Sequence, residues 1–242
     1  IFIILDEHKY NFSYDKILKS CYEDCKVVTL KNITRGSVES CLHAEKLINN
    51  KNPLVIFTMD VCFRPILKKS DLNNFADGGL LTFQSNSKKY SYAQVDNNNL
   101  VLKTAEKETI SNNAIVGIYY FRKGSDFVKY GKEMIKKNLS TRNEFFVAPL
   151  YNLMIKDRKK IKTKIIESIH IFGTPEELDF FENHVLRQEI KEPIGLCADH
   201  SGYKLKEIFK KQLKSMNLKF IDYGTYRKEN CDYNDFVKLA AD

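Results

Sequence analysis

Apolar runs and amphipathic stretches alternate in the N-terminal part of the chain. The segment from Pro53 to Asp60 is an apolar, β-branched run that follows a proline and stops at a carboxylate, a pattern typical of a strand buried on both faces. The same reasoning predicts strands at Ile1–Leu5 and Lys26–Leu30 and helices at Asn11–Cys25 and Ser37–Asn49. Such alternation predicts parallel pairing with right-handed crossovers, so we expect an α/β fold with a doubly wound, mostly parallel sheet.

Beyond Asp60, turn residues separate the apolar runs more often. The predicted strands are Leu80–Gln84, Tyr90–Val95, Leu100–Ala105, Ala114–Phe121 and Lys164–Ile171, and the predicted helices are Ser125–Asn138, Phe145–Asp157 and one from Pro175 to about Leu186. The second and third strands are predicted to form a hairpin around the turn at Asp96–Asn99. Gly117 interrupts the fourth strand, where a glycine marks either the close approach of a ligand or a bulge, and the pattern does not choose between them.

A second unit is predicted after a polar, proline-stopped segment at Glu189–Pro193. Its elements are a strand at Ile194–Ala198, a polar turn at Asp199–Gly202, a helix at Tyr203–Met216 and a strand at Lys219–Asp222. This is the start of a second Rossmann-like α/β domain, and we expect it to be incomplete because one crossover cannot cover both faces of its sheet. The expected domains are therefore 1–190 and 193–242. The lysines of the helix are expected on a solvated face; they are Lys204, Lys206, Lys210, Lys211 and Lys214.

The composition is that of a globular protein, with 43% hydrophobic residues, 16 Phe and 13 Tyr. No apolar run approaches the roughly 20 residues of a membrane span, and the run at Ile1–Leu5 is too short for a signal peptide, so we expect a cytoplasmic protein without a membrane partner. The six cysteines lack CxxC spacing and are expected to be reduced thiols without zinc. The net charge of +8 suits anionic small substrates, and because the lysines are interleaved with acids we expect no nucleic-acid partner.

Three places carry candidate chemistry. Asp60, at the carboxyl end of its strand, could hold a Mg²⁺ ion or simply begin the next turn. Glu106 and Lys107 put an acceptor beside a cation at a strand end, although most such pairs are solvated. Asp199 and His200 follow a buried strand, where they could relay protons or orient a sugar, yet a lone histidine is more often structural.

Residues 1–186 resemble the sugar nucleotidyltransferase family, in the branch found in capsule and surface-polysaccharide loci. The matching motifs are Thr34-Arg35-Gly36, Pro53 to Asp60, Asp77-Gly78-Gly79, Tyr90 to Ala93, Ala105-Glu106-Lys107 with Ile110-Ser111, Val116 to Phe121, Asn143 to Phe146 through Pro149 to Asn152, and Gly173 to Leu178. The resemblance implies a nucleotide-diphospho-sugar transferase-like fold. It also implies a reaction in which a sugar 1-phosphate attacks the α-phosphate of a nucleoside triphosphate and pyrophosphate leaves.

The same resemblance implies roles for individual residues. Asp60 would hold the catalytic Mg²⁺, and Lys107 would clamp the sugar phosphate. The implied substrate-binding residues are Thr34 and Gly36 near the base, Glu106 on the sugar hydroxyls, Gly117 at the sugar, and Val116 and Glu144. The sequence departs from the family at two points, because the N-terminal glycine-rich loop that cradles the triphosphate is not in it and Ile171 stands where a second metal-binding aspartate is usual.

Residues 193–242 resemble the start of the ribose-5-phosphate isomerase B and galactose-6-phosphate isomerase family. The matching motifs are Ala198 to Lys206, Ile221 to Thr225 and Cys231 to Phe236. The resemblance implies a sugar-phosphate aldose-ketose isomerase domain with Asp199 and His200 at the substrate, while the family's cysteine base lies beyond this segment. We expect the chain to be an internal piece of a bifunctional, homo-oligomeric protein that takes a nucleoside triphosphate, a sugar 1-phosphate and a second sugar phosphate.

Two other classes of protein remain compatible with the sequence. A family 2 glycosyltransferase would share the sheet and the metal carboxylate but would want a second acid near Asp60, and Val61–Phe63 offers none. A non-catalytic binding module for sugar phosphates or nucleotides would keep the sheet, and Ile171 together with the missing loop keeps this alternative open. Dinucleotide binding is disfavoured because no glycine fingerprint follows the first strand.

Overall fold

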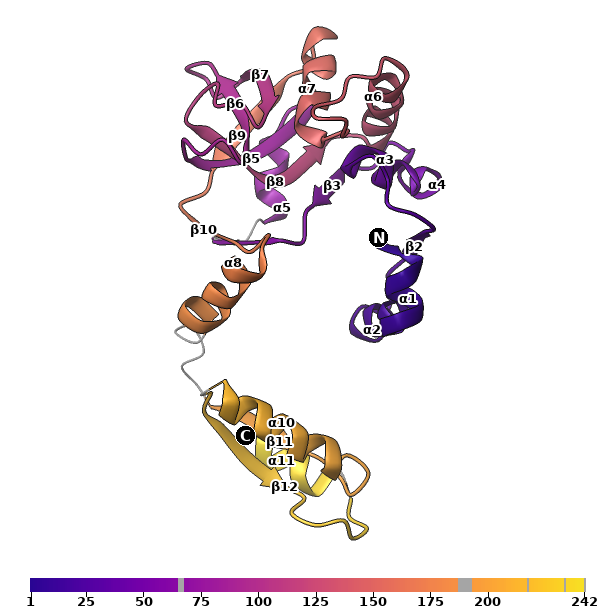
Figure 1. The fold of residues 1–242 in the computed structure, drawn as a ribbon, viewed down its shortest axis with the longest axis vertical. Helices are drawn as coiled ribbons and strands as arrows, with labels where there is room; N and C mark the ends of the chain where they lie inside the picture. Colours follow the sequence, from indigo (N-terminus) through magenta and orange to yellow (C-terminus); the bar gives the residue numbers. More distant parts are fainter. Residues whose placement is uncertain (65–67, 187–192, 217, 233, 242) are drawn as a thin grey trace. The chain divides into compact units, whose positions relative to one another are not determined.

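The computed structural model describes residues 1–64, 68–186, 193–216, 218–232 and 234–241 (Figure 1). The chain divides into two compact units, Ile1–Ile169 and His170–Asp242. This division comes earlier in the chain than the expected change of domain between 190 and 193. The expected linker at Glu189–Pro193 lies outside the described residues, except for Pro193.

A six-stranded sheet forms the centre of the first unit. Its order is β7-β6-β8-β5-β9, with β3 also paired to β8. The strands are β3 (Leu54–Phe57), β5 (Gly78–Gln84), β6 (Ser91–Val95), β7 (Val101–Glu106), β8 (Asn113–Phe121) and β9 (Ile161–Ile165). The α/β class is confirmed. The sheet is mixed instead of mostly parallel, because β8 runs antiparallel to β3, β5 and β6 while β5 and β9 run parallel.

Two amphipathic helices cover the sheet of the first unit, α6 (Gly124–Lys136) and α7 (Val147–Lys156) (Figure 1). Aromatic rings fill the space between these helices and β8: the Phe121 ring lies 4.9 Å from that of Tyr151 and 5.3 Å from that of Phe127, centroid to centroid. All three side chains are fully buried. Burial of large apolar side chains is the main source of stability here, so β8 and its helices form the core against which the site loops are held.

The N-terminal segment forms a smaller βαβ arrangement. β1 (Phe2–Leu5) and β2 (Val27–Leu30) pair in parallel as predicted, but they form a separate two-stranded sheet. The single helix expected at Asn11–Cys25 is instead α1 (Asp6–Phe12) and α2 (Tyr14–Cys21), because Ser13 between them has a left-handed backbone with φ of 53°. The expected helix at Ser37–Asn49 is likewise α3 (Ser37–Leu42) and α4 (Glu45–Ile48), separated by a tight turn at His43 and Ala44.

The strand β3, which was predicted to end at Asp60, is shorter than expected and its residues are more exposed to solvent. It ends at Phe57, and its residues alternate between half-buried and exposed, with Val55 43% and Phe57 44% exposed. The prediction that this strand is buried on both faces was therefore wrong. Among the described residues β3 pairs with β8 alone, so a β-branched run was not enough to reveal which of its faces would be covered.

Shorter elements complete the first unit and cross into the second. They are β4 (Val61–Arg64), α5 (Lys69–Asn73) and β10 (Ser168–Ile171). The strand expected over Lys164–Ile171 is thus divided between β9 and β10. Among the described residues no helix combines the length and the apolar content needed to cross a membrane.

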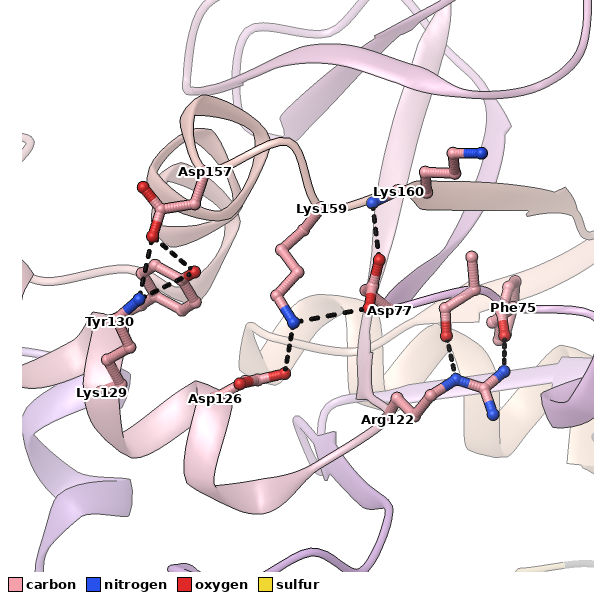
Figure 2. Close-up of polar contacts among 10 residues, drawn as sticks. Phe75, Asp77, Arg122, Asp126, Lys129, Tyr130, Asp157, Lys159 and Lys160 are labelled. Carbon is pink, nitrogen blue, oxygen red and sulfur yellow. Dashed lines mark hydrogen bonds and ion pairs between the residues drawn. The ribbon is translucent and has the colours of Figure 1, made fainter.

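Charged side chains form ion pairs and hydrogen bonds at the amino ends of β5 and β9 (Figure 2). The ammonium of Lys159 lies 3.5 Å from carboxylate oxygens of both Asp77 and Asp126, and Asp77 also accepts a hydrogen bond of 2.9 Å from the backbone N–H of Lys160. Arg122, just after β8, donates to the backbone carbonyls of Phe75 and Ala76. The Asp77-Gly78-Gly79 motif therefore has a structural use at the amino end of the parallel strands, away from the carboxyl end where Asp60 lies.

The second unit contains one parallel strand pair. β11 (Ile194–Cys197) pairs with β12 (Phe220–Gly224), and α10 (Tyr203–Ser215) connects them, as the sequence predicts. The unit also contains α8 (Pro175–Phe180), η1 (Phe181–Leu186), which is a π-helix, and α11 (Asn234–Ala241). Thr174 caps α8 by accepting a hydrogen bond of 3.2 Å from the N–H of Glu177, which confirms the start of this helix at Pro175.

Candidate functional site

Asp60 and Gly117 are connected through Thr58. The strand β3 ends before Thr58, whose N–H and hydroxyl both donate to the carbonyl oxygen of Gly117, at 3.1 Å and 3.3 Å. Gly117 has φ of +94°, and a Cβ there would lie 2.4 Å from the Thr58 hydroxyl. The glycine is thus required by a backbone approach within the chain, and this contact fixes the turn that presents the exposed Asp60.

Glu106 lies at the end of β7, opposite Ser91 in the register of β6 and β7. Its carboxylate accepts a hydrogen bond from the Ser91 hydroxyl. Burial raises the pKa of Glu106, and Glu144 raises it further, while the hydrogen bond from Ser91 and the charges of Lys107 and Arg142 lower it. A half-buried carboxylate with these neighbours is suited to accept hydrogen bonds from a polar ligand.

Tyr119 connects the environment of Glu106 with that of Asp60. Its ring is buried in β8, and this burial raises the pKa of its hydroxyl, an effect to which the negative charges of Glu106 and Asp60 both add. The two carboxylates, one at the end of β7 and one in the turn after β3, therefore act on the same hydroxyl group. Sequence reasoning missed Tyr119 and Ser91 because neither residue type signals a site unless its neighbours across the sheet are known.

Lys107 is held in a specific backbone conformation next to Glu106. It has φ of 55°, unusual for a side chain of this size, and its N–H donates to the carbonyl of Tyr90 at 3.0 Å. Its ammonium lies 4.7 Å from the centroid of the Phe146 ring, a cation-π contact. Strained residues of this kind concentrate at functional sites, so the geometry supports a role for Lys107 beyond that of a solvated strand end.

A tight turn supplies Glu144 and a second cation. Residues Thr141 and Glu144 form an isolated bridge, and the two residues between them, Arg142 and Asn143, have φ of 51° and 66°. Arg142 and Glu144 both contribute to the electrostatic environment of Glu106. Arg142 is a further candidate that the sequence reasoning missed, because an arginine in a polar loop is usually just solvated.

The Thr34-Arg35-Gly36 turn packs against the segment that follows Glu144. Gly36 has φ of +115°, and a Cβ there would lie 2.7 Å from the backbone nitrogen of Phe145, which donates to the carbonyl of Arg35 at 2.6 Å. Thr34 shares a hydrogen bond of 2.6 Å with Ser40, and it lines a cavity of about 530 Å³ that opens beside this turn. Thr34 and Gly36 are thereby brought to the same loop as Glu144, whereas Val116 is buried inside β8.

The expected Mg²⁺ site is tested by its available ligands. Magnesium in phosphate-binding sites is usually held by one or two carboxylates together with phosphate oxygens and waters. Asp60 offers one exposed carboxylate, and the described residues contain no group of three His, Cys, Asp or Glu side chains arranged around a common point. Ile171 offers no oxygen ligand from its side chain. Asp60 would therefore supply one carboxylate to such an ion, with its remaining ligands coming from outside a His, Cys, Asp and Glu cluster.

In the second unit Asp199 and His200 lie in the turn after β11. One carboxylate oxygen of Asp199 accepts a hydrogen bond of 2.9 Å from the N–H of Gly202, which closes the turn before α10. The Nδ1 atom of His200 lies 3.5 Å from the backbone N–H of Cys231 and accepts from it. That contact favours the tautomer with the proton on Nε2, which leaves Nε2–H as a donor for a ligand.

The lysines of α10 do not all lie on a solvated face, and that expectation was wrong for two of them. Lys206 is buried, with its side chain 2% exposed, and forms an ion pair with Asp222 of β12; Lys210 lies 2.6 Å from the other oxygen of the same carboxylate. Burial opposes the charge of Asp222, but the hydrogen bonds from both lysines outweigh it and lower the pKa of Asp222. Periodicity alone could not reveal this pair, because the acid comes from another strand.

Comparison with solved structures identifies the fold of the larger part of the chain. The chain is similar to a nucleoside-diphosphate-sugar pyrophosphorylase from Vibrio cholerae RC9, with a TM-score of 0.66 and 23% identity over 74% of this chain and 78% of that one. A Bacillus anthracis structure described as a glucose-1-phosphate thymidylyltransferase is similar with a TM-score of 0.56 and 17% identity over 73% and 72% of the two chains. The chain thus has the sugar nucleotidyltransferase fold.

Comparison of sequences identifies the C-terminal segment. Residues 194–242 match the profile of the Ribose/Galactose Isomerase family. A protein of Rickettsia bellii (strain RML369-C) described as a sugar phosphate isomerase is 38% identical over 48 residues, which are 20% of this chain and 33% of that protein. The chain therefore spans about a third of the length of this curated relative. Both resemblances found in the sequence are confirmed, whereas the capsule branch stays a prediction.

Proposed function

We propose that the first unit is a sugar-phosphate nucleotidyltransferase, which joins a sugar 1-phosphate to a nucleoside triphosphate and releases pyrophosphate. The observation that carries the proposal is the gathering of Glu106, Lys107, Arg142 and Glu144, with Asp60 acting on the same tyrosine as Glu106. The similarity to nucleoside-diphosphate-sugar pyrophosphorylases supports it. A role in capsule or surface-polysaccharide synthesis is part of the same proposal and rests on the sequence motifs.

In this proposal the side chains act by positioning and by neutralising charge, which phosphoryl-group chemistry chiefly requires. The ammonium of Lys107 binds the sugar phosphate, and Arg142 offers a second cation nearby. Glu106 accepts hydrogen bonds from the sugar hydroxyls, held in orientation by Ser91. A Mg²⁺ ion on Asp60 would supply charge neutralisation at the triphosphate when bound.

Pyrophosphate release with Mg²⁺ across a panel of nucleoside triphosphates and sugar 1-phosphates tests the proposal, on this chain and on the complete product of its gene. Asp60→Asn and Lys107→Gln are each expected to lower kcat/KM by at least about 100-fold, the scale of removing a charge-stabilising group. Asp157→Asn is the matched control: it makes the same exchange of a carboxylate for an amide at the C-terminal end of α7, where Asp157 pairs with Lys129 of α6 and has no role in the proposed activity. Equal pyrophosphate release by Asp60→Asn and wild type would refute the assignment.

A non-catalytic binding module is the second candidate for the first unit. It is favoured by the single exposed carboxylate at Asp60 and by Ile171, which leave a metal with few protein ligands among the described residues. Calorimetric binding of a sugar 1-phosphate or a nucleotide, without pyrophosphate release by the complete gene product, would establish this alternative. Release would exclude it.

We also propose that the second unit belongs to a sugar-phosphate aldose-ketose isomerase domain. The match to the Ribose/Galactose Isomerase profile supports this, as does the orientation of His200 by Cys231. The test is interconversion of aldose and ketose phosphates by the complete gene product. His200→Asn is expected to lose this activity, and unchanged activity in that variant would count against His200.

A further inference from the structure

A second cavity, of about 420 Å³, lies beside the edge strand β9 in the first unit. Its walls come from three places: Asp71 and Phe75 in and after α5, Asn98 and Asn99 at the tip of the β6–β7 hairpin, and residues 162–165 of β9. Pockets for small ligands commonly have volumes of roughly 300 to 1,000 Å³, so this cavity is large enough for one. None of the residues to which the proposed activities are assigned lines it.

Two contacts hold the walls of this cavity together. At one side the hairpin tip reaches β9, where the N–H of Thr163 donates to the carbonyl of Asn99 at 3.1 Å and Leu100 forms a bridge with Lys162. At the other side the ammonium of Lys164 lies 2.6 Å from the carboxylate of Asp71. The cavity is therefore a gap enclosed by two fixed connections to the same strand.

The hairpin tip is ordered before any ligand arrives. One carboxylate oxygen of Asp96 accepts hydrogen bonds of 2.8 Å from the N–H groups of both Asn98 and Leu100, and Asn99 adopts φ of 59°, a conformation that asparagine tolerates well. The Asn98 and Asn99 side chains thus start from a fixed backbone. Fixed donors bind a ligand at a lower entropic cost than mobile ones.

The charges around the cavity favour an anion. Two ammonium groups, Lys162 and Lys164, and one carboxylate, Asp71, line it. The carboxylate is already engaged by Lys164 and by the backbone N–H of Lys68 at 2.9 Å, whereas Lys162 forms no ion pair with any described residue. Lys162 and Lys164 are two residues apart in a strand and so project to the same face. One cation without an ion-pair partner among the described residues, Lys162 of β9, therefore lines the same cavity as the carboxamides of Asn98 and Asn99 on the hairpin tip.

We propose that this cavity is a second binding site of the first unit, which takes a phosphorylated small molecule with its phosphate held by Lys162, Asn98 and Asn99. Lysine and amide N–H groups are standard donors to phosphate oxygens. Ile165, which is 54% exposed, and the largely buried Phe75 also line the cavity and offer the rest of the ligand apolar contacts. The phosphate could belong to a nucleotide or to a sugar phosphate, since the chemistry is shared. The site is distinct from Glu106 and Lys107, which lie at the opposite end of β7.

Titration calorimetry of the full chain tests the proposal with four probes: inorganic phosphate, ATP, glucose 1-phosphate and citrate. Lys162→Gln is expected to weaken binding of the phosphorylated probe about tenfold, because a charge-assisted hydrogen bond is lost. Lys160→Gln is the matched control, since it removes the same charge two residues away, from a residue that does not line the cavity. Asn98→Ala is likewise compared with Asn97→Ala, because only Asn98 lines the cavity.

Lys107→Gln separates this site from the proposed catalytic one. The binding that Lys162→Gln weakens is expected to persist in Lys107→Gln, whether or not the chain transfers nucleotides. In spectra of protein labelled with ¹⁵N asparagine, the side-chain amide signals of Asn98 and Asn99 are expected to shift on addition of the phosphorylated probe. Equal losses in Lys162→Gln and Lys160→Gln, no loss in either, or citrate binding as tightly as the phosphorylated probes would each overturn the proposal.

Discussion

At the scale of single residues, Gly117 is a position where backbone geometry constrains the proposed site. Gly117→Ala is expected to lower the free energy of unfolding by about 1 to 3 kcal/mol, because alanine at φ of +94° is strained and its Cβ would meet the Thr58 hydroxyl at 2.4 Å. Urea unfolding followed by circular dichroism measures this. Gly195→Ala is the control, since the nearest atom to a Cβ there is 3.5 Å away.

The contact with Thr58 can be isolated by a double-mutant cycle. If the clash contributes, the double variant Thr58→Ala with Gly117→Ala loses less stability than the sum of the two single losses. A Gly117→Ala protein as stable as the wild type would show that the turn leading to Asp60 does not depend on this approach.

The raised pKa of Glu106 predicts how the free energy of unfolding depends on pH. Its folded-state pKa lies above the ordinary value of 4.5, mainly because of burial. The unfolded chain therefore releases this proton at lower pH than the folded protein. As a result, the free energy of unfolding falls as pH rises from 4.5 through the raised pKa of Glu106. Above that pKa the loss stays constant. Glu106→Gln is expected to gain stability relative to the wild type over that rise.

Urea unfolding at intervals from pH 4.5 to pH 8 measures the difference in free energy of unfolding between Glu106→Gln and the wild type. Glu108→Gln, which changes an exposed carboxylate two residues further along, is expected to keep the pH dependence of the wild type. A difference between Glu106→Gln and the wild type that does not vary with pH would contradict the raised pKa.

Some residues of the candidate site could be predicted from the sequence, and others could not, for a physical reason. Asp60, Glu106 and Lys107 stand out because each is a charged group at the end of an apolar run. Ser91, Tyr119 and Arg142 become candidates only once the sheet register and the 141–144 turn are known, since their distinguishing property is the environment of Glu106. Local sequence patterns do not reveal which residues lie opposite one another on neighbouring strands.

At the scale of elements, the ion pairs between α10 and β12 hold the second unit together. Asp222→Asn is expected to destabilise this unit by about 2 to 4 kcal/mol, because it leaves the buried ammonium of Lys206 with only the more distant carboxylate of Glu207, at 3.7 Å, as a counter-charge. Lys206→Met is expected to cost less, because Asp222 keeps Lys210 and the N–H of Gly224. Hydrogen exchange of the α10 amides, read by mass spectrometry over residues 203–215, measures both.

Lys211→Met provides the control for this pair of substitutions. Lys211 is exposed on the same helix, so the amide exchange rates of α10 in the Lys211→Met variant are expected to match those of the wild type. Faster exchange in Lys206→Met than in Asp222→Asn would mean that burial of the lysine, and not the missing counter-charge, controls the stability of the helix.

The order of strands shows where sequence reasoning about elements ends. The parallel pairs β1–β2 and β11–β12 were predicted, because each is a local crossover of strand, helix and strand. The pairing of β3 with β8 was not predicted, because the paired residues, such as Leu54 and Phe121, are 60 or more positions apart in the chain. Local patterns favour a continuing parallel sheet, whereas the antiparallel β8 is fixed by packing with α6 and α7.

At the scale of the whole molecule, the residues proposed for the two activities fall on either side of the division at Ile169. Asp60, Glu106 and Lys107 lie in the first unit, and Asp199 and His200 lie in the second. Each set is held by contacts within its own unit, through Thr58 and Gly117 in one and through Gly202 and Cys231 in the other. Substitutions in one set should therefore leave the other chemistry intact.

This separation is the last prediction. In the complete gene product, Asp60→Asn is expected to lower kcat/KM for pyrophosphate release by at least about 100-fold while aldose-ketose interconversion stays within about twofold of the wild type. Asp199→Asn is expected to do the reverse, because asparagine keeps the oxygen that accepts from Gly202 but lacks the charge. Both activities are measured in one preparation whose circular dichroism matches the wild type. If either substitution removed both activities from such a preparation, the two sets of residues would form one functional site, and the assignment of one activity to each unit would be wrong.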